Sequence, residues 1–363
     1  MKSLDEKTWA QLSAFGDDSP LCIKTTDSSI DGVRLIDDDE KSVPYVTRSD
    51  SNNGLARFVS SKNYEFGSDD GGCITVGLDT QTAFYQPHKF VTWQNIQIIT
   101  GESLNEDVAQ FMVPILRQQM TAKFNWGGNG ATLGRMKRLT VMLPVTDSGE
   151  LDYEYMAEYT RQKRETMLNK YFEYVEERIA EMEHKGIPAL DEKEWKPILI
   201  SSMFELVRGR ENNMAMLEDG DTPLISAKAN NNGLKGFVHN PKKIIIGQCI
   251  TLNNDGDGGA GLAYYQPANM ALDSHVTALV PLFDMSAFSM LFIAKCISGL
   301  HGFFGHGLSI SNPRAKRLRI MLPIDDSGEP DYAYMEQYSK NMMLRKYKQY
   351  LEFINRQNIT EVD

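Results

Sequence analysis

Basic and amide side chains near glycine-rich stretches are the residues of this sequence whose types and spacing best suit binding chemistry. Cations can contact phosphate groups, and amide or aromatic side chains on a neighbouring loop can contact base edges in a nucleic-acid groove. In the first half of the chain these candidates are Arg48, Asn52, Asn53, Lys62, Gln81, Thr82, Lys123, Trp126, Arg135 and Lys137. In the second half they are Lys228, Asn230, Asn232, Lys235, Lys243, His301, His306, Arg314 and Lys316. For any one of them taken singly, a solvated turn residue is the competing interpretation.

Catalytic signatures are missing from the sequence. It contains no GxxxxGK[ST] phosphate loop, no GxSxG nucleophile motif, no HExxH zinc motif and no Asn-Pro-Pro-aromatic methyltransferase motif. The stretch 253–261 matches the start of a calcium loop, but Tyr264 stands where a bidentate glutamate is needed. The six histidines share no ligand spacing. We therefore expect neither an active site nor a metal site on this chain.

The composition is that of a globular protein. The chain has 363 residues, of which 41% are hydrophobic and 24% charged, and its net charge is −11. At about 150 residues per domain, two domains are expected. Four widely spaced cysteines favour a reducing compartment, so we expect a cytoplasmic protein with no membrane segment. Because an acidic chain repels phosphate on average, nucleic acid would have to be bound through local basic patches.

The elements that must position the candidate residues occur twice. Five motifs recur in one order with a nearly constant offset, namely Asn-Asn-Gly-Leu at 52 and 231, Cys-Ile-Thr at 73 and 249, Tyr-Gln-Pro at 85 and 265, Lys-Arg-Leu at 137 and 316, and Met-Leu-Pro at 142 and 321. This period is far longer than that of a solenoid, so each copy is a whole domain with its connector.

Each copy reads as a mixed α and β domain. Short strands are expected at 44–47 and 223–226, each leading into the Asn-Asn-Gly turn, where Asn and Gly accept a positive φ angle. Segments 74–76 and 140–143 have β-type composition. Apolar residues within 108–116 follow the spacing of a helix that is buried on one face.

A long helix is expected after each Met-Leu-Pro motif. Asp152 is placed as the N-cap of the first, which should run to Lys185 and span about 50 Å at about 1.5 Å per residue. Asp331 begins the second. Apolar residues at heptad spacing form one stripe on each helix, Leu168, Phe172, Val175 and Ile179 on the first and Leu344, Tyr347, Leu351 and Ile354 on the second. Such complementary stripes predict an antiparallel coiled coil between the two helices.

The predicted fold class is α+β, a tandem duplication with pseudo-twofold symmetry. Two mixed domains, residues 1–150 and 189–330, are each followed by a spacer helix, residues 151–188 and 331–363. Because a coiled coil is rigid, the two mixed domains would be held at opposite ends of a rod. The two copies differ most in their loops, so ligands of different sequence are expected at the two ends.

The sequence resembles the DNA-specificity (S) subunits of type I and type IIB-like restriction-modification systems. The resemblance covers nearly the whole chain and is carried by the twofold repeat, the Asn-Asn-Gly-Leu turn, the Tyr-Gln-Pro strand, the Lys-Arg-Leu to Met-Leu-Pro signal and the Asp-Ser-Gly-Glu segment before each long helix. It implies two target-recognition domains and two paired helices that dock methyltransferase subunits, on a subunit that is itself non-catalytic.

The resemblance also implies partners. The chain would bind double-stranded DNA at a bipartite, asymmetric site and direct DNA methyltransferase subunits there, with a restriction subunit or domain in cleaving complexes. This chain would hold no cofactor, because S-adenosylmethionine belongs to the methyltransferase. Two alternatives stay open. One is an acidic interaction scaffold or anti-restriction decoy that binds a methyltransferase but not DNA, and the other is a self-sufficient enzyme.

Overall fold

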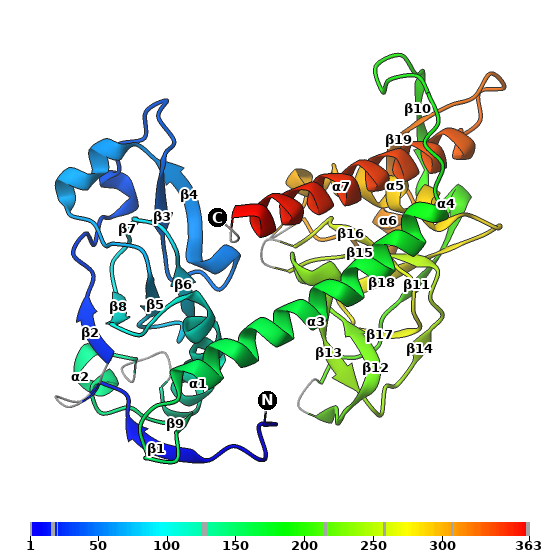
Figure 1. Cartoon of the computed structure of the whole chain (residues 1–363). Coiled ribbons are helices and arrows are strands. Elements are labelled where there is room, and N and C mark those ends of the chain that lie inside the picture. The colour runs from blue at the N-terminus through cyan, green and yellow to red at the C-terminus, as the bar shows by residue number, and fades with distance from the viewer. Residues whose placement is uncertain are drawn as a thin grey trace. The chain divides into compact units, whose positions relative to one another are not determined.

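The computed structural model describes residues 2–15, 19, 21–124, 130–213, 216–256, 259–305 and 308–360 (Figure 1). The chain divides into two compact units, residues 1–172 and 173–363. Each unit combines a two-stranded sheet, two larger sheets and helices. The α+β class predicted from the sequence is therefore confirmed.

The first unit is built on three sheets. The two-stranded sheet pairs β1 (Trp9–Ser13) with β9 (Thr140–Pro144), so that Trp9 lies opposite Pro144. The four-stranded sheet has the order β2 (Leu21–Thr25), β8 (Ile96–Gly101), β5 (Cys73–Gly77) and β6 (Ala83–Gln86). The three-stranded sheet has the order β4 (Leu55–Val59), β3 (Val43–Val46) and β7 (Val91–Thr92).

Helix α1 (Glu106–Lys123) covers the four-stranded sheet next to β6. Asn105 caps it by accepting a hydrogen bond from the Val108 N–H at 3.0 Å. Its apolar face, which includes Phe111, Met112 and Leu116, is buried in the core, as the sequence periodicity predicts. The short helix α2 (Leu133–Met136) leads into β9.

The second unit repeats this plan. Its two-stranded sheet pairs β10 (Trp195–Leu199) with β19 (Arg319–Pro323), and Trp195 lies opposite Pro323. One four-stranded sheet has the order β11 (Phe204–Arg208), β18 (Val276–Pro281), β15 (Cys249–Asn253) and β16 (Ala263–Gln266). The other has the order β13 (Leu234–Val238), β12 (Asp219–Ile225), β17 (Met270–Leu272) and β14 (Ile244–Ile245). The equivalent strand order supports the duplication inferred from the motifs.

Three further α-helices lie within the described residues of the second unit. Helix α5 (Ala287–Ser298) takes the place of α1 and lies beside α7 (Tyr332–Thr360), as Figure 1 shows. The short helices are α4 (Ile200–Met203) and α6 (Asn312–Ala315). Within the portion of the chain that the structure describes, no helix combines the length and apolar character needed to cross a membrane.

The two long helices are α3 (Tyr153–Ala180) and α7, with 28 and 29 residues. The sequence predicts that the first continues to Lys185, but α3 ends at Ala180. The carbonyl oxygens of Glu183 and Lys185 instead accept hydrogen bonds at 2.8 Å from the side-chain amides of Gln337 and Asn341 on α7. Because α7 satisfies these carbonyl groups, the segment needs no further helical bonds.

Candidate nucleic-acid interface

The Asn-Asn-Gly turns adopt the backbone conformation that the sequence predicts. Asn52 and Asn53 have φ angles of 51° and 54°, and Asn231 and Asn232 both have 50°. Asparagine tolerates this left-handed region better than other residues with a Cβ. The side chains of all four are exposed. Their repetition in both units is therefore explained by turn geometry, while their amide groups face solvent.

A buried glutamine fastens each turn to the sheet behind it. Gln86 donates from Nε2 to the Asn53 carbonyl oxygen at 2.9 Å and to Thr75 Oγ1 at 3.1 Å. Gln266 makes the equivalent two contacts in the second unit at the same distances. Both glutamines are buried. The repeated Tyr-Gln-Pro motif is thus a structural tie between the turn and strand β5 or β15.

Three segments of the first unit meet at the turn between β5 and β6. The Leu78 N–H donates to the Asn95 carbonyl at 3.0 Å, and the Ala131 N–H donates to the Leu78 carbonyl at 2.8 Å. We call this arrangement the hairpin edge, and in the first unit it comprises residues 78–82, 93–95 and 130–132. The candidates Gln81 and Thr82 lie within it, and Arg48 and Arg135 contact its residues.

Arg48 lies at this edge between two partners. Its guanidinium forms an ion pair with Asp79 and lies over the Trp93 ring, 4.4 Å from the ring centroid. Gln81 has a φ angle of 54° and donates from Nε2 to the Asp79 carbonyl at 2.9 Å. Thr82 is buried and its hydroxyl bonds within the turn. Arg48 and Gln81 therefore present polar groups at the edge, whereas Thr82 shapes the turn.

An arginine braces the adjoining loop in both units. Arg135 Nη1 donates to the Gly130 carbonyl at 2.9 Å, and Arg314 Nη1 donates to the Ser309 carbonyl. The two arginines occupy matching positions just before β9 and β19. Each thus helps to hold the loop before it. Two further candidates, Trp126 and His306, lie outside the described residues.

The second unit has an equivalent hairpin edge, made of residues 254–256, 259–262, 273–275 and 308–311. The Asn254 N–H donates to the His275 carbonyl at 2.8 Å, and the Ile310 N–H donates to the Asn254 carbonyl at 2.7 Å. His275 Nδ1 lies 2.7 Å from Asp255 Oδ1, and His301 Nδ1 bonds the Ala260 carbonyl at 2.5 Å. The backbone scaffold matches that of the first unit, but the side chains differ.

The remaining candidates lie outside the hairpin edges, and some of them contact other groups. Lys62 Nζ lies 2.9 Å from Asp38, and chiefly this hydrogen bond raises the pKa of Lys62. Lys123 Nζ lies 3.3 Å from Thr140 Oγ1, and Lys228 Nζ lies 3.3 Å from the Leu234 carbonyl oxygen. The backbone N–H of Lys243 faces the Glu211 carboxylate at 3.4 Å. Four further candidates are simply exposed, namely Lys137, Asn230, Lys235 and Lys316.

The sequence reasoning missed an ion pair at the start of each long helix. Asp152 caps α3 by accepting a hydrogen bond from the Tyr155 N–H at 2.9 Å, and it lies 2.5 Å from Lys7 Nζ. In the second unit Asp331 is bonded to the Tyr334 N–H at 2.9 Å and lies 2.8 Å from Lys193. We call these two contacts the cap ion pairs.

A sixth repeated motif could have revealed the cap ion pairs. Leu-Asp-Glu-Lys-x-Trp occurs at 4–9 and again at 190–195. In each copy the tryptophan Nε1 donates to the carbonyl of the motif's leucine, at 2.9 Å for Trp9 and 2.8 Å for Trp195. The motif therefore folds the same way twice and presents its lysine to the helix cap.

The apolar stripes of the long helices lie partly in the second unit. Three stripe residues are buried, namely Val175, Leu344 and Ile354. The rings of Tyr174 and Tyr347 pack edge to face, with 6.5 Å between their centroids. The other stripe residues are half-buried, namely Leu168, Phe172, Ile179 and Leu351. The continuous antiparallel coiled coil stays a prediction.

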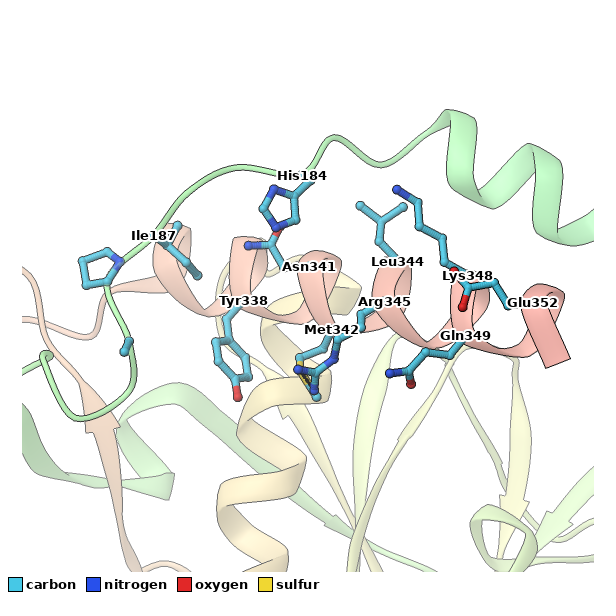
Figure 2. A pocket seen from close by; sticks show the side chains of 12 residues that line it. His184, Ile187, Tyr338, Asn341, Met342, Leu344, Arg345, Lys348, Gln349 and Glu352 are labelled. Carbon is cyan, nitrogen blue, oxygen red and sulfur yellow. Dashed lines mark hydrogen bonds between the residues drawn. The ribbon is translucent and has the colours of Figure 1, made fainter.

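A groove of about 630 Å³ lies where residues 184–189 run beside α7 (Figure 2). Its lining includes His184, Tyr338, Met342, Arg345 and Lys348. Aromatic, thioether and cationic side chains thus line one groove on the surface of the second unit.

Comparison with known proteins identifies the family of this chain. The sequence matches the family model of the type I restriction modification DNA specificity domain twice, over residues 32–170 and 192–352. The chain belongs to this family. It is a specificity subunit, a protein that recognises DNA, which confirms the main interpretation of the sequence over the decoy alternative.

Relatives of this specificity subunit include the type II restriction enzyme BgcI specificity subunit S.BcgI of Heyndrickxia coagulans. The two are 24% identical over 308 residues, which cover 84% of this chain and 86% of the relative. Similar solved structures include a type I restriction-modification S subunit from M. genitalium, with 13% identity, a TM-score of 0.48 and coverage of 99% and 96% of the two chains. The HsdS subunit from Thermoanaerobacter tengcongensis has 14% identity, a TM-score of 0.31 and coverage of 96% and 91%.

The two family matches include most of the features described above. Both hairpin edges of this specificity subunit lie within them, as do the cap residues Asp152 and Asp331. Lys193 lies inside the second match, whereas Lys7 lies before the first. The cap ion pair of the first unit is therefore completed by a residue outside the matched region.

Proposed function

We propose that this chain is the non-catalytic subunit of a restriction-modification enzyme and reads a split DNA site whose two halves differ in sequence. Its two units would each read one half-site. The observation that carries the proposal is that the two hairpin edges share one backbone scaffold but carry different side chains. A shared scaffold suits one kind of ligand, and different side chains suit different base sequences.

In this proposal, residues 1–150 and 189–330 are the target-recognition domains, and residues 151–188 and 331–363 are spacer helices that pair antiparallel. The stripes from Leu168 to Ile179 and from Leu344 to Ile354 would form the seam. The family resemblance supports docking of DNA methyltransferase subunits on these helices. Those subunits would bind S-adenosylmethionine. Where the complex also cleaves DNA, a further subunit or domain would carry out the cleavage.

The candidate DNA-binding residues fall into two groups under this proposal. Exposed lysines such as Lys137 and Lys316 suit phosphate contacts, which fix the position of the protein on the duplex. Gln81 belongs to a hairpin edge, and Arg48 and His301 each contact one, where side chains would reach bases. All four cysteines are free, which fits the reducing cytoplasm.

A methylation map of the whole genome tests the proposal. Cells that carry this chain and its methyltransferase should methylate one split, asymmetric motif, and deletion of this chain alone should abolish methylation at that motif. The purified chain should show neither methyl transfer nor cleavage by itself. An unchanged map after the deletion would contradict the proposed role, and turnover by the chain alone would contradict the non-catalytic assignment.

A further inference from the structure

We infer that Arg48, oriented by Asp79 and Trp93, reads a guanine in the half-site of the first unit, and that the second unit reads a different base with the matching part of its edge. This inference rests on the proposed function and adds to it the identity of one base and of the residue that selects it.

The position of Arg48 is fixed by three neighbouring segments. Arg48 follows β3, Trp93 follows β7, and Asp79 lies in the turn after β5. Strands β3 and β7 pair in parallel, and the Trp93 N–H donates to the Val46 carbonyl at 2.8 Å. The sheet register therefore places the indole ring under the guanidinium, and the hairpin turn places the carboxylate beside it.

The side chain of Arg48 is held rather than solvated. It is 21% exposed, and that of Asp79 is 25% exposed. Its Nε atom is buried and has no hydrogen-bond acceptor among the residues that the structure describes. Stacking on an aromatic ring and pairing with a carboxylate restrict the rotamers of an arginine, so less entropy is lost when its donors meet a ligand.

The paired carboxylate favours a base over a phosphate as the ligand of Arg48. Asp79 cancels the charge of the guanidinium, and its own negative charge repels a phosphate group. Asp79 contacts Nη1 and Nε is buried, so the remaining Nη N–H groups are the donors for a base, and such directional donors suit the O6 and N7 acceptors that guanine presents in the major groove. An oriented arginine within a charge-neutral ion pair therefore suits guanine.

The second unit lacks this arrangement at the matching place. The Thr47 N–H donates to the Gly54 carbonyl and the Ser226 N–H to the Gly233 carbonyl, so that Ala227 occupies the position of Arg48. By the same comparison, Asp273 occupies the position of Trp93, since its N–H bonds the Ile225 carbonyl at 2.9 Å.

The second edge carries a histidine–aspartate pair instead. His275 Nδ1 lies 2.7 Å from Asp255. No arginine stacked on an aromatic ring takes the place of Arg48 among the described residues of this edge. The two half-sites should therefore differ at the corresponding base.

The test measures methylation of a DNA library by the full complex of this chain with its methyltransferase. The first half-site is randomised, and the native chain is compared with Arg48→Ala and Arg48→Lys. We expect the native complex to require guanine at one position, and both variants to lose about ten- to hundredfold of that preference at this position alone. The preference at the second half-site should not change.

A modified base tests the same contact in the native complex itself. Replacement of the guanine by 7-deazaguanine removes the N7 acceptor and should lower methylation by the native complex about fivefold or more, but should leave the Arg48→Ala complex unaffected. This arm remains informative even where a variant folds poorly.

Arg57→Ala is the matched control, because Arg57 also pairs with an aspartate, Asp37 at 2.9 Å, but lies exposed on β4. It should leave every base preference unchanged. A uniform loss across all sequences for Arg48→Ala would identify a phosphate contact and overturn the inference, and unchanged preferences would overturn it as well. If the native complex itself shows no sequence preference, the proposed function fails and the inference with it.

Discussion

The cap ion pair of the first unit should contribute measurably to folding, and Asp152→Ala is the perturbation that removes it. Asp152 does two things at once, because it caps α3 through the Tyr155 N–H and pairs with Lys7. The Lys7 side chain is only 10% exposed and the Asp152 side chain 19%. The alanine variant therefore leaves both an uncapped helix and a largely buried, unpaired ammonium group.

These contacts set the size of the effect. Loss of an N-cap costs about 1 kcal/mol, and loss of a hydrogen bond to a charged group costs about 1.5–3 kcal/mol. Asp152→Ala should therefore lower the free energy of unfolding by about 2.5–4 kcal/mol. In the double variant Lys7→Met with Asp152→Ala, no charge is left unpaired, so only the cap should be lost, at about 1 kcal/mol.

Urea unfolding of the full chain, followed by circular dichroism and tryptophan fluorescence, gives these values by linear extrapolation. Asp331→Ala is the matched variant in the second unit, where Lys193 is 17% exposed, and a loss of the same size is expected. If the double variant Lys7→Met with Asp152→Ala is as unstable as the sum of its single variants, the two side chains are not coupled and the reasoning is refuted.

Three other perturbations test the spacer helix, the turn tie and the charge of the cap. Insertion of one heptad between Lys170 and Tyr171 lengthens α3 by about 10 Å. Methylation mapping should then show a spacer between the two half-sites that is longer by about three base pairs. Altered half-site sequences would contradict the assignment of α3 as a spacer helix. Gln86→Leu and Gln266→Leu each remove two hydrogen bonds and should destabilise their own unit by about 1–3 kcal/mol in urea unfolding, whereas unchanged stability would refute the tie. Burial raises the pKa of Asp152, but the bonds from Lys7 and the helix N–H outweigh it and leave that pKa lowered; its stabilisation is thus complete above the unfolded pKa of about 3.9 and lost as pH falls through the folded value. The native chain should have a higher free energy of unfolding than Asp152→Asn at neutral pH, and this difference should disappear in acid. A difference that persists in acid would exclude the charge of Asp152 as its cause.

Features set by local physics could be predicted from the sequence. The positive φ angles of Asn53 and Asn232 follow from residue type, and the buried face of α1 follows from its periodicity. The end of α3 could not be predicted, because it depends on side chains of α7 that bind the Glu183 and Lys185 carbonyls. Tertiary contacts of this kind leave no trace in the local sequence.

The candidate site was only partly predictable for the same reason. The sequence indicates that Arg48 is basic and near a turn, but its partners Asp79 and Trp93 lie on two other segments. Only the strand register brings the three together. Lys62 shows the opposite case, since a side chain that suits a phosphate contact is engaged by Asp38 in the folded chain.

The duplication separates scaffold from specificity within one molecule. The turn conformation, the glutamine ties, the arginine braces and the cap ion pairs occur in both units with partners at equivalent positions, so they cannot distinguish one half-site from the other. Arg48 and Trp93 correspond to Ala227 and Asp273, and this difference lies at an edge whose backbone bonds are unchanged. A specificity subunit that reads two different sequences with one fold must vary where the scaffold allows variation, and the hairpin edge meets that requirement.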